Sequence, residues 1–376
     1  MEETEEIDET ERRAWLTLAL CIDGRPGTWL RFADACGGPA KAIAAPDDEL
    51  AGRGASPAAI ALLRSATERT DRVLEDCRKA GITISPRGSP DYPELVADIG
   101  DPPIVLFWRG AAPSALVPSI AIVGARRCSA YAERTARRIG REVAETGVTV
   151  TSGLARGVDG AAHRGALESG RTMAVLAGGL DHVYPGEHRE LAERIVDKGG
   201  SLVSEQPPGV RPLAWLFPYR NRIITGVSAA TIVVEAGLKS GSLASARHAL
   251  DQGRQVFAVP GQIDSPPCEG SNQLLVQGAP PFCSLVDLCA VTALKDRLEK
   301  TTRKLLKPKQ ILLSDLSPDE ASLLTAISAG AATPDEIEAA TALDGTRVLA
   351  LLTALELDGH IRREDHGRFR AMVRGA

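Results

Sequence analysis

The chain of 376 residues is 44% hydrophobic and has a formal net charge of −5. This length allows two or three domains with buried cores. Seven acidic side chains lie within the first eleven residues, so the remainder of the chain is close to neutral. Bulk charge therefore neither requires nor excludes a nucleic-acid ligand, and any DNA contact must come from a local cluster of Arg and Lys.

Cysteine spacing and hydropathy indicate a reduced, cytoplasmic protein that does not enter a membrane. The seven cysteines form no Cys-x-x-Cys pair, and every apolar run is shorter than a membrane helix needs. His182 and His188 lie near Asp181 and Glu187, but their spacing matches no metal motif, so we expect no metal. No cofactor is expected either.

The chain begins with an acidic segment, residues 1–11, that is predicted to be disordered. Residues 12–80 show helical spacing and form a small helical module. Within it, Ser56 and Pro57 are a good N-cap and first position for a helix that runs to about Lys79.

Residues 81–292 are predicted to form an α/β domain with an extended Rossmann-type, doubly wound, mostly parallel sheet. A Pro- and Gly-rich connector with one or two strands of its own comes first. Six short β-branched runs then alternate with amphipathic helical segments. The runs are Ile120–Val123, Val148–Thr151, Met173–Leu176, Ser201–Val203, Thr231–Val234 and Val256–Val259.

A basic linker is predicted over residues 293–315, because Lys295–Lys309 holds seven basic and two acidic residues. Residues 316–376 are predicted to form a winged-helix domain. Helix starts at Ser317-Pro318 and Thr333-Pro334 are followed by a third helix, Asp344 to about Leu357, and by a short hairpin.

Candidate ligand-binding residues follow the strands, where a parallel sheet presents Gly-rich turns and helix N-termini to anions. Any one of these glycine turns could equally serve packing alone. Arg220 and Arg222 suit phosphates and Phe217 suits a base, although the arginines could instead form a buried ion-pair cluster. Asp159 and His163 are assigned a capping and packing role rather than catalysis. The candidate set is Gly124, Arg126, Ser129, Gly153, Arg156, Gly157, Phe217, Arg220, Asn221, Arg222, Lys239, Ser240, Gly241 and Ser242.

The order of these motifs resembles the bacterial DNA-processing protein A family (DprA, also called Smf). The resemblance rests on Ile122–Arg126, Ser152–Asp159 with His163, Phe217–Ile224, Ser240–Ser242 and Ala258–Gly261, and it covers about residues 93–287. The flanking modules resemble the family's sterile-alpha-motif or helix-hairpin-helix domain and its winged helix.

The resemblance implies a dimer that binds and protects incoming single-stranded DNA and loads the RecA recombinase in natural transformation, without ATP hydrolysis. It also implies that the candidate set lines the DNA pocket, with Gly153, Arg156 and Gly157 in its floor, and that the dimer interface lies around residues 245–290. Two departures from the family pattern, Ala125 for Ser and Ala244-Ser245 for Ile-Thr, remove no charge.

Three other functions were weighed. A nucleotide phosphoribohydrolase on the same Rossmann variant needs a glutamate where this chain has Ser245. A nicotinamide or flavin oxidoreductase needs G-x-G-x-x-G, which the first turn lacks. A winged-helix transcription regulator needs basic residues on its third helix, which offers only Arg347.

Overall fold

The computed structural model describes residues 8–21, 32–295, 298, 317–357, 361–363 and 367–371. The chain divides into two compact units, residues 1–300 and 301–376. No helix among the described residues is long and apolar enough to cross a membrane.

Among the described residues, four helices precede the sheet: α1 (Glu9–Leu20), α3 (Pro39–Ala44), α4 (Asp47–Gly52) and α5 (Pro57–Lys79). Asp8 caps α1 by accepting a hydrogen bond from the backbone N–H of Glu11, and Ser56 caps α5 in the same way through Ala59. The predicted disordered tail is therefore wrong at its end. Carboxylates stabilise the positive end of a helix, so the acidic run continues into the first turn of α1. Residues 1–7 lie outside the described residues.

An eight-stranded sheet forms the centre of the first unit, in the order β1-β2-β6-β5-β4-β3-β7-β8. The pairs β1/β2 and β2/β6 are antiparallel, and all other neighbours are parallel. This arrangement confirms the predicted doubly wound, mostly parallel sheet. The strands are β1 (Thr83–Pro86), β2 (Val105–Gly110), β3 (Ser119–Val123), β4 (Thr149–Ser152), β5 (Thr172–Leu176), β6 (Ser201–Ser204), β7 (Ser228–Val233) and β8 (Gln255–Ala258).

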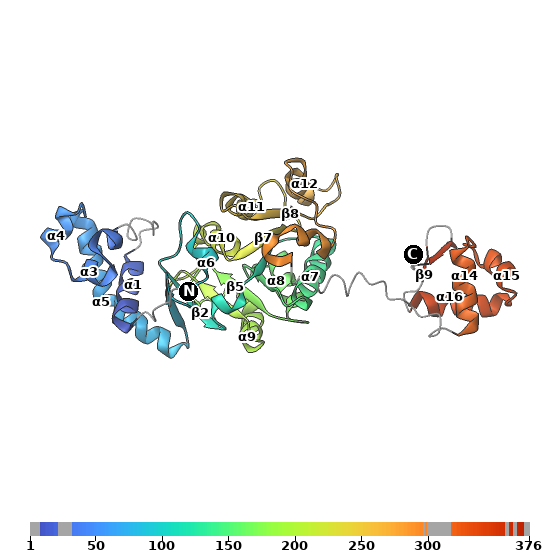
Figure 1. The fold of residues 1–376 in the computed structure, drawn as a ribbon, viewed down its shortest axis with the longest axis horizontal. Helices are drawn as coiled ribbons and strands as arrows, with labels where there is room; N and C mark the ends of the chain where they lie inside the picture. The colour runs from blue at the N-terminus through green and yellow to red at the C-terminus, as the bar shows by residue number, and fades with distance from the viewer. Residues whose placement is uncertain are drawn as a thin grey trace. The chain divides into compact units, whose positions relative to one another are not determined.

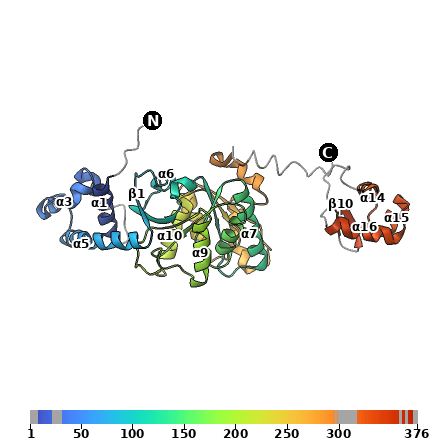
Figure 2. The ribbon, with the colours of Figure 1, turned by 90° about the horizontal axis from the view of Figure 1, so that it is seen from below.

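Helices cover both faces of the sheet because successive strand residues point to opposite sides. On β3, Ile120 and Ile122 pack with the helices over residues 130–145 and 158–166, whereas Ala121 and Val123 pack with those over residues 216–226 and 241–251. Figures 1 and 2 show the helices of this domain arranged around the sheet. The helices of this domain are α6 (Glu94–Ala97), α7 (Ala130–Glu145), α8 (Val158–Ala166), α9 (Arg189–Asp197), α10 (Leu216–Gly226), α11 (Gly241–Asp251) and α12 (Glu269–Val276).

The N-terminal helices share a hydrophobic core with one end of the sheet. Leu16 of α1 and Leu63 of α5 belong to the same buried cluster as Phe107 of β2 and Ile195 of α9. The predicted boundary near residue 80 therefore falls between α5 and β1, inside one compact unit.

The C-terminal unit contains α14 (Pro318–Ser328), α15 (Pro334–Thr341), α16 (Gly345–Leu357) and the hairpin β9 (Ile361–Arg363) and β10 (Phe369–Ala371). Capping boxes at Ser317 and Thr333 start the first two helices. Three helices and a hairpin around one core confirm the predicted winged helix. Most of the predicted basic linker lies outside the described residues.

Helices α7 and α8 cross at a distance that only glycine allows. A Cβ atom on Gly165 would collide with the backbone carbonyl of Arg137. We expect Gly165→Ala to lower the free energy of unfolding by about 2 kcal/mol or more, because the backbones must separate. Thermal melting of purified protein would measure this loss.

Gly52→Ala is the matched control, because Gly52 ends α4 with open space around the added methyl group. Equal melting temperatures for the two variants would show that the close helix contact is not required.

Candidate functional site

The loops that follow β3, β4 and β7 meet α10 and the start of α11 around a cavity of about 780 Å³. Strand β3 lies between β4 and β7 in the sheet, and the chain leaves it toward β4 before it returns on the other side as β7. The cavity therefore lies where strand order reverses, beyond the carboxyl ends of the strands. This is the usual ligand position in an open α/β sheet.

Four cationic side chains line the cavity: Arg126, Arg127, Arg220 and Lys239. In the described part of the chain, Asp159 is the only acidic residue that lines it. Among the described residues, no carboxylate lies within ion-pair distance of any of the four cations. The cavity thus has a surplus of positive charge, although the whole chain is acidic.

Arg220 is buried at the base of the cavity and is held by backbone carbonyls. Its Nη1 donates to the carbonyl oxygens of Gly153, at 3.0 Å, and Val175. Burial lowers the Arg220 pKa to about 10, while the charge of Asp159 opposes the shift. The guanidinium is therefore protonated at neutral pH. A Cβ atom on Gly153 would overlap it, so this position requires glycine.

Asp159 balances this charge from the start of α8. Its Oδ2 accepts a hydrogen bond from the backbone N–H of Gly153 at 3.1 Å. Burial raises the Asp159 pKa, and the charge of Arg220 opposes the shift. His163, one turn later, is buried with its Nδ1 2.7 Å from the hydroxyl of Thr172. Asp159 thus supports the loop that follows β4, and His163 joins α8 to β5, in line with their predicted capping and packing role.

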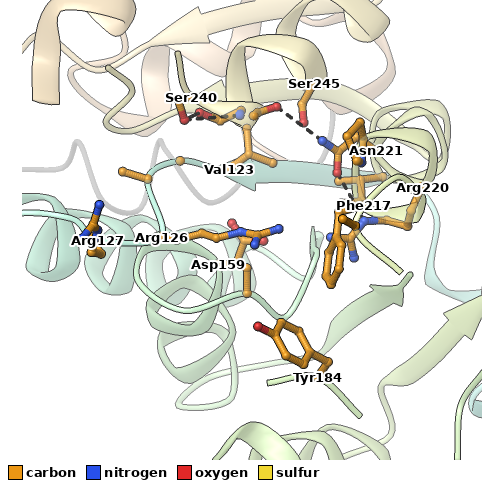
Figure 3. Close-up of a pocket in the computed structure, with 18 of the residues that line it drawn as sticks. Val123, Arg126, Arg127, Asp159, Tyr184, Phe217, Arg220, Asn221, Ser240 and Ser245 are labelled. Atoms are coloured by element: carbon orange, nitrogen blue, oxygen red, sulfur yellow. Dashed lines mark hydrogen bonds between the residues drawn. The ribbon is translucent and has the colours of Figure 1, made fainter. Parts of the chain in front are cut away.

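Two aromatic rings stand beside the cations. The guanidinium of Arg126 lies 4.7 Å from the centre of the Phe217 ring, and Phe217 meets Tyr184 edge to face at 5.5 Å. Figure 3 shows Arg126 reaching from the β3 loop toward Phe217, whereas Arg127 lies to one side. A flat, π-rich group can stack on such a surface, and an anion can bind the adjoining guanidinium.

A smaller hollow of about 220 Å³ adjoins the cavity and shares Arg126, Tyr184 and Phe217 with it. Arg156 lines this hollow rather than the main cavity, and it pairs with Glu187 at 2.7 Å. Gly157 has a φ of +71°, and a Cβ atom at this position would collide with the backbone carbonyl of Ala125. It thereby shapes the floor without contacting the cavity itself.

The start of α11 supplies the wall opposite Arg126. Ser240 caps the helix, and its hydroxyl lies 2.7 Å from that of Ser242. The amide of Asn221 donates to the carbonyl of Gly241 at 3.4 Å. Lys239 is exposed beside this helix N-terminus, so its charge adds to the positive end of the helix dipole. These residues line the cavity, as does Gly124.

Ser129 does not line the cavity, contrary to expectation. Its hydroxyl caps α7 by accepting from Ala132 N–H at 3.1 Å, and its own N–H donates to the buried carboxylate of Glu235 at 3.0 Å. Serine is a favoured N-cap residue, and Ser129 occupies the N-cap position of α7. Its hydroxyl therefore bonds to the helix and does not face the cavity.

Arg222 also lies outside the cavity. Its guanidinium forms a buried ion pair with Glu205 at 2.7 and 2.9 Å and lies 4.0 Å from the centre of the Tyr219 ring. Positions two apart on a helix point about 200° apart, so Arg220 and Arg222 must face opposite sides of α10. The ion-pair alternative is thus correct for Arg222 and incorrect for Arg220.

Sequence reasoning missed several lining residues, and Arg127 and Tyr184 are the cationic and the aromatic side chain among them. Arg127 directly follows a selected arginine and carried a usable signal. Tyr184 lies in the Pro- and Gly-containing segment after β5, which pattern analysis treats as a plain loop.

Comparison with known proteins identifies the family. Residues 83–293 match the family model for DNA recombination-mediator protein A, and residues 307–367 match the DprA winged helix domain. The chain belongs to the DNA recombination-mediator protein A family. The DprA/Smf resemblance is therefore confirmed.

Individual relatives agree with this assignment. Protein Smf of Escherichia coli is 48% identical over 197 residues, which span 52% of this chain and 53% of that protein. The X-ray structure of DprA from Streptococcus pneumoniae superposes with a TM-score of 0.64 at 29% identity, over 76% of this chain and 98% of that one. DNA processing protein A from Helicobacter pylori, whose structure concerns its single-stranded DNA binding mode, gives 0.50 at 26% identity, over 59% and 96%.

The Arg222–Glu205 pair generates a stability prediction. Arg222→Ala leaves the buried Glu205 carboxylate without its partner and should cost about 3–5 kcal/mol of unfolding free energy. Adding Glu205→Gln should recover part of the loss, because it removes the unpaired charge. Chemical denaturation of the single and double variants would measure both effects.

The same pair sets a pH dependence. Burial raises the pKa of Glu205, and the charge of Arg222 opposes this rise. Without Arg222 the folded-state pKa of Glu205 moves higher. The protonated carboxyl group then stabilises the fold in acid, and this stability is lost as pH rises above the ordinary pKa of Glu. Arg222→Ala should thus lose more stability over this range than the wild type. A parallel pH profile for the two proteins would contradict the assignment.

Proposed function

We propose that this protein binds single-stranded DNA in the cationic cavity, protects it and delivers it to the RecA recombinase without hydrolysing ATP. The observation that carries the proposal is a cluster of four cations beside two aromatic rings, with no ion-pair partner for these cations in the described part of the chain. Cations attract the phosphate backbone, and rings stack with any base. Bases in a duplex are stacked inward and cannot reach such rings, so we expect preference for single strands.

The alternative of nucleotide hydrolysis receives less support from the site. Ser245, which stands where a phosphoribohydrolase would carry its glutamate, lines the cavity. The carboxylate of Asp159 also lines the cavity, but it already accepts a backbone hydrogen bond and compensates the buried charge of Arg220. A general acid or base needs a carboxyl group that can reach the substrate. Binding is therefore the better-supported activity.

Relatives support the DNA-binding part of the proposal. The family is one of recombination mediators, and the Helicobacter pylori relative has a described single-stranded DNA binding mode. We infer a homodimer in the cytoplasm, with its interface around residues 245–290. In that region Ile263 and Val276 are 95% and 88% exposed, which is unusual for large apolar side chains that meet only water.

Single-strand binding can be measured by fluorescence anisotropy with labelled oligothymidine at two salt concentrations. We expect salt-sensitive binding that Arg126→Ala weakens about tenfold or more, because Arg126 is exposed and already aligned with Phe217. Arg138→Ala, an exposed arginine on α7 that pairs with Glu142, is the matched control. Its affinity should match that of the wild type.

An unlabelled duplex of the same length serves as competitor. Equal competition by duplex and single strand, or equal affinities of Arg126→Ala and Arg138→Ala, would show that the cavity is not the binding site.

Delivery to the recombinase makes a separate prediction. RecA filaments form slowly on strands covered by a single-strand binding protein, and this chain should speed their formation. RecA ATPase activity on such strands would report the effect. Arg126→Ala should lose the stimulation in proportion to its lost DNA affinity. Full stimulation by Arg126→Ala would mean that delivery does not depend on this cavity.

A further inference from the structure

The cavity is too small to account for a binding site on a polymer. Its volume of about 780 Å³ is that of a pocket for a single small molecule. Proteins that bind single strands without sequence preference contact roughly 4–16 nucleotides in each binding domain. If the proposed function holds, most of the bound strand must cross the surface outside the cavity.

The segment that leads into α10 forms one side of that rim. Pro212 and Ala214 line the cavity. The residues between and beside them, Arg211, Leu213 and Trp215, are exposed to solvent. Trp215 is 57% exposed and Leu213 is 52% exposed. A strand that leaves the cavity over this wall would meet these side chains first.

Trp215 is exposed on a firmly attached backbone rather than on a loose loop. The carbonyl of Val210 accepts a hydrogen bond from Gly179 at 2.8 Å, and the N–H of Gly209 donates to Asp181 at 2.9 Å. At the other end, Leu216 donates to the carbonyl of Leu213 at 3.0 Å. Burying an indole is favourable, so its exposure on a fixed segment calls for a ligand.

The ring of Trp215 is also held in place by a neighbouring aromatic ring. It lies 6.4 Å from the ring of Tyr219, at an angle of 50°. Tyr219 is itself fixed by a hydrogen bond from its hydroxyl to Asp101 at 3.2 Å and by the guanidinium of Arg222 over its ring. The buried pair of Arg222 with Glu205 therefore supports a ladder of side chains that ends in an exposed indole.

We propose that Trp215 is a second stacking platform for the same DNA strand, outside the cavity, with Arg211 as its phosphate contact. Among the described residues, no carboxylate lies within ion-pair distance of Arg211, so its charge is available to a phosphate. The single strand is the expected occupant because the platform adjoins the cavity directly. In the segment 211–215, Pro212 and Ala214 line the cavity, and the residues that alternate with them are exposed beside it. A protein partner would not need that continuity.

Oligomers of two lengths separate the platform from the cavity. Labelled oligothymidines of about 4 and about 20 nucleotides are titrated against wild type, Trp215→Ala and Trp215→Phe. We expect Trp215→Ala to weaken binding of the long oligomer about tenfold and to leave the short one within about twofold. Trp215→Phe should keep most of the affinity, because it keeps a ring. Leu349→Ala, which removes a similarly exposed side chain from α16, is the control.

Indole emission supplies a direct readout. The chain has four tryptophans, so Trp108→Phe and Trp215→Phe each keep three. Trp108 is half-buried and donates to Ser85 at 2.7 Å, so Trp108→Phe removes one indole without touching the platform. The long oligomer should quench the emission of Trp108→Phe more strongly than that of Trp215→Phe.

The outcomes distinguish this inference from the function on which it rests. Wild-type affinity of Trp215→Ala for the long oligomer, or equal quenching of the two fluorescence variants, would overturn the platform and leave the cavity intact. Equal loss of affinity for both oligomers would also overturn it, because Trp215 would then act through the cavity. Failure of the wild-type protein to bind either oligomer would overturn both proposals.

Discussion

A guanidinium held between two backbone carbonyls determines what the cavity can bind. Arg220 donates to Gly153 and Val175, and neither carbonyl carries a full charge. The negative charge of Asp159 partly compensates the cost of burying the Arg220 guanidinium. It acts by longer-range electrostatic attraction, without a direct ion pair. The positive charge is thus desolvated in advance and only partly neutralised. An arriving phosphate would meet a side chain that has already lost its water and its rotational freedom.

Helix α10 keeps this arrangement in place by using its two sides differently. Phe217, Arg220 and Asn221 face the cavity, whereas Tyr219 and Arg222 face the segment around Glu205. A charge that binds a ligand must lack a carboxylate partner, and a charge that fixes a helix must have one. The Arg-Asn-Arg sequence satisfies both needs because its two arginines lie on opposite faces. The ion pair on the far side therefore positions the unpaired arginine on the near side.

Much of the sheet could be predicted from sequence, because buried parallel strands are short apolar runs that alternate with amphipathic helices. All six predicted runs coincide with β3–β8. The sheet in turn predicts that residues after strands gather at one edge, which is why most of the candidate set lines the cavity or its floor. The local pattern also located α5 and the winged helix from their capping residues.

What failed depended on partners distant in sequence. Ser129 bonds to Glu235 and Arg222 pairs with Glu205, and no spacing rule reveals which carboxylate folding brings to a given side chain. Tyr184 joins the site because it meets Phe217, a contact set by the path of two loops. The acidic N-terminal run was taken for a tail because composition does not show that Asp8 caps a helix.

The third helix of the winged-helix domain offers little for reading a DNA groove. In α16, the helix of a winged-helix domain that would enter a DNA groove, the one basic side chain is Arg347, and it pairs with Asp319 at 2.9 Å. Reading a major groove requires donors free to reach base edges, and a basic surface to hold the duplex. This helix instead exposes Leu349. The exposed face of α16 is therefore better suited to a protein contact than to base edges.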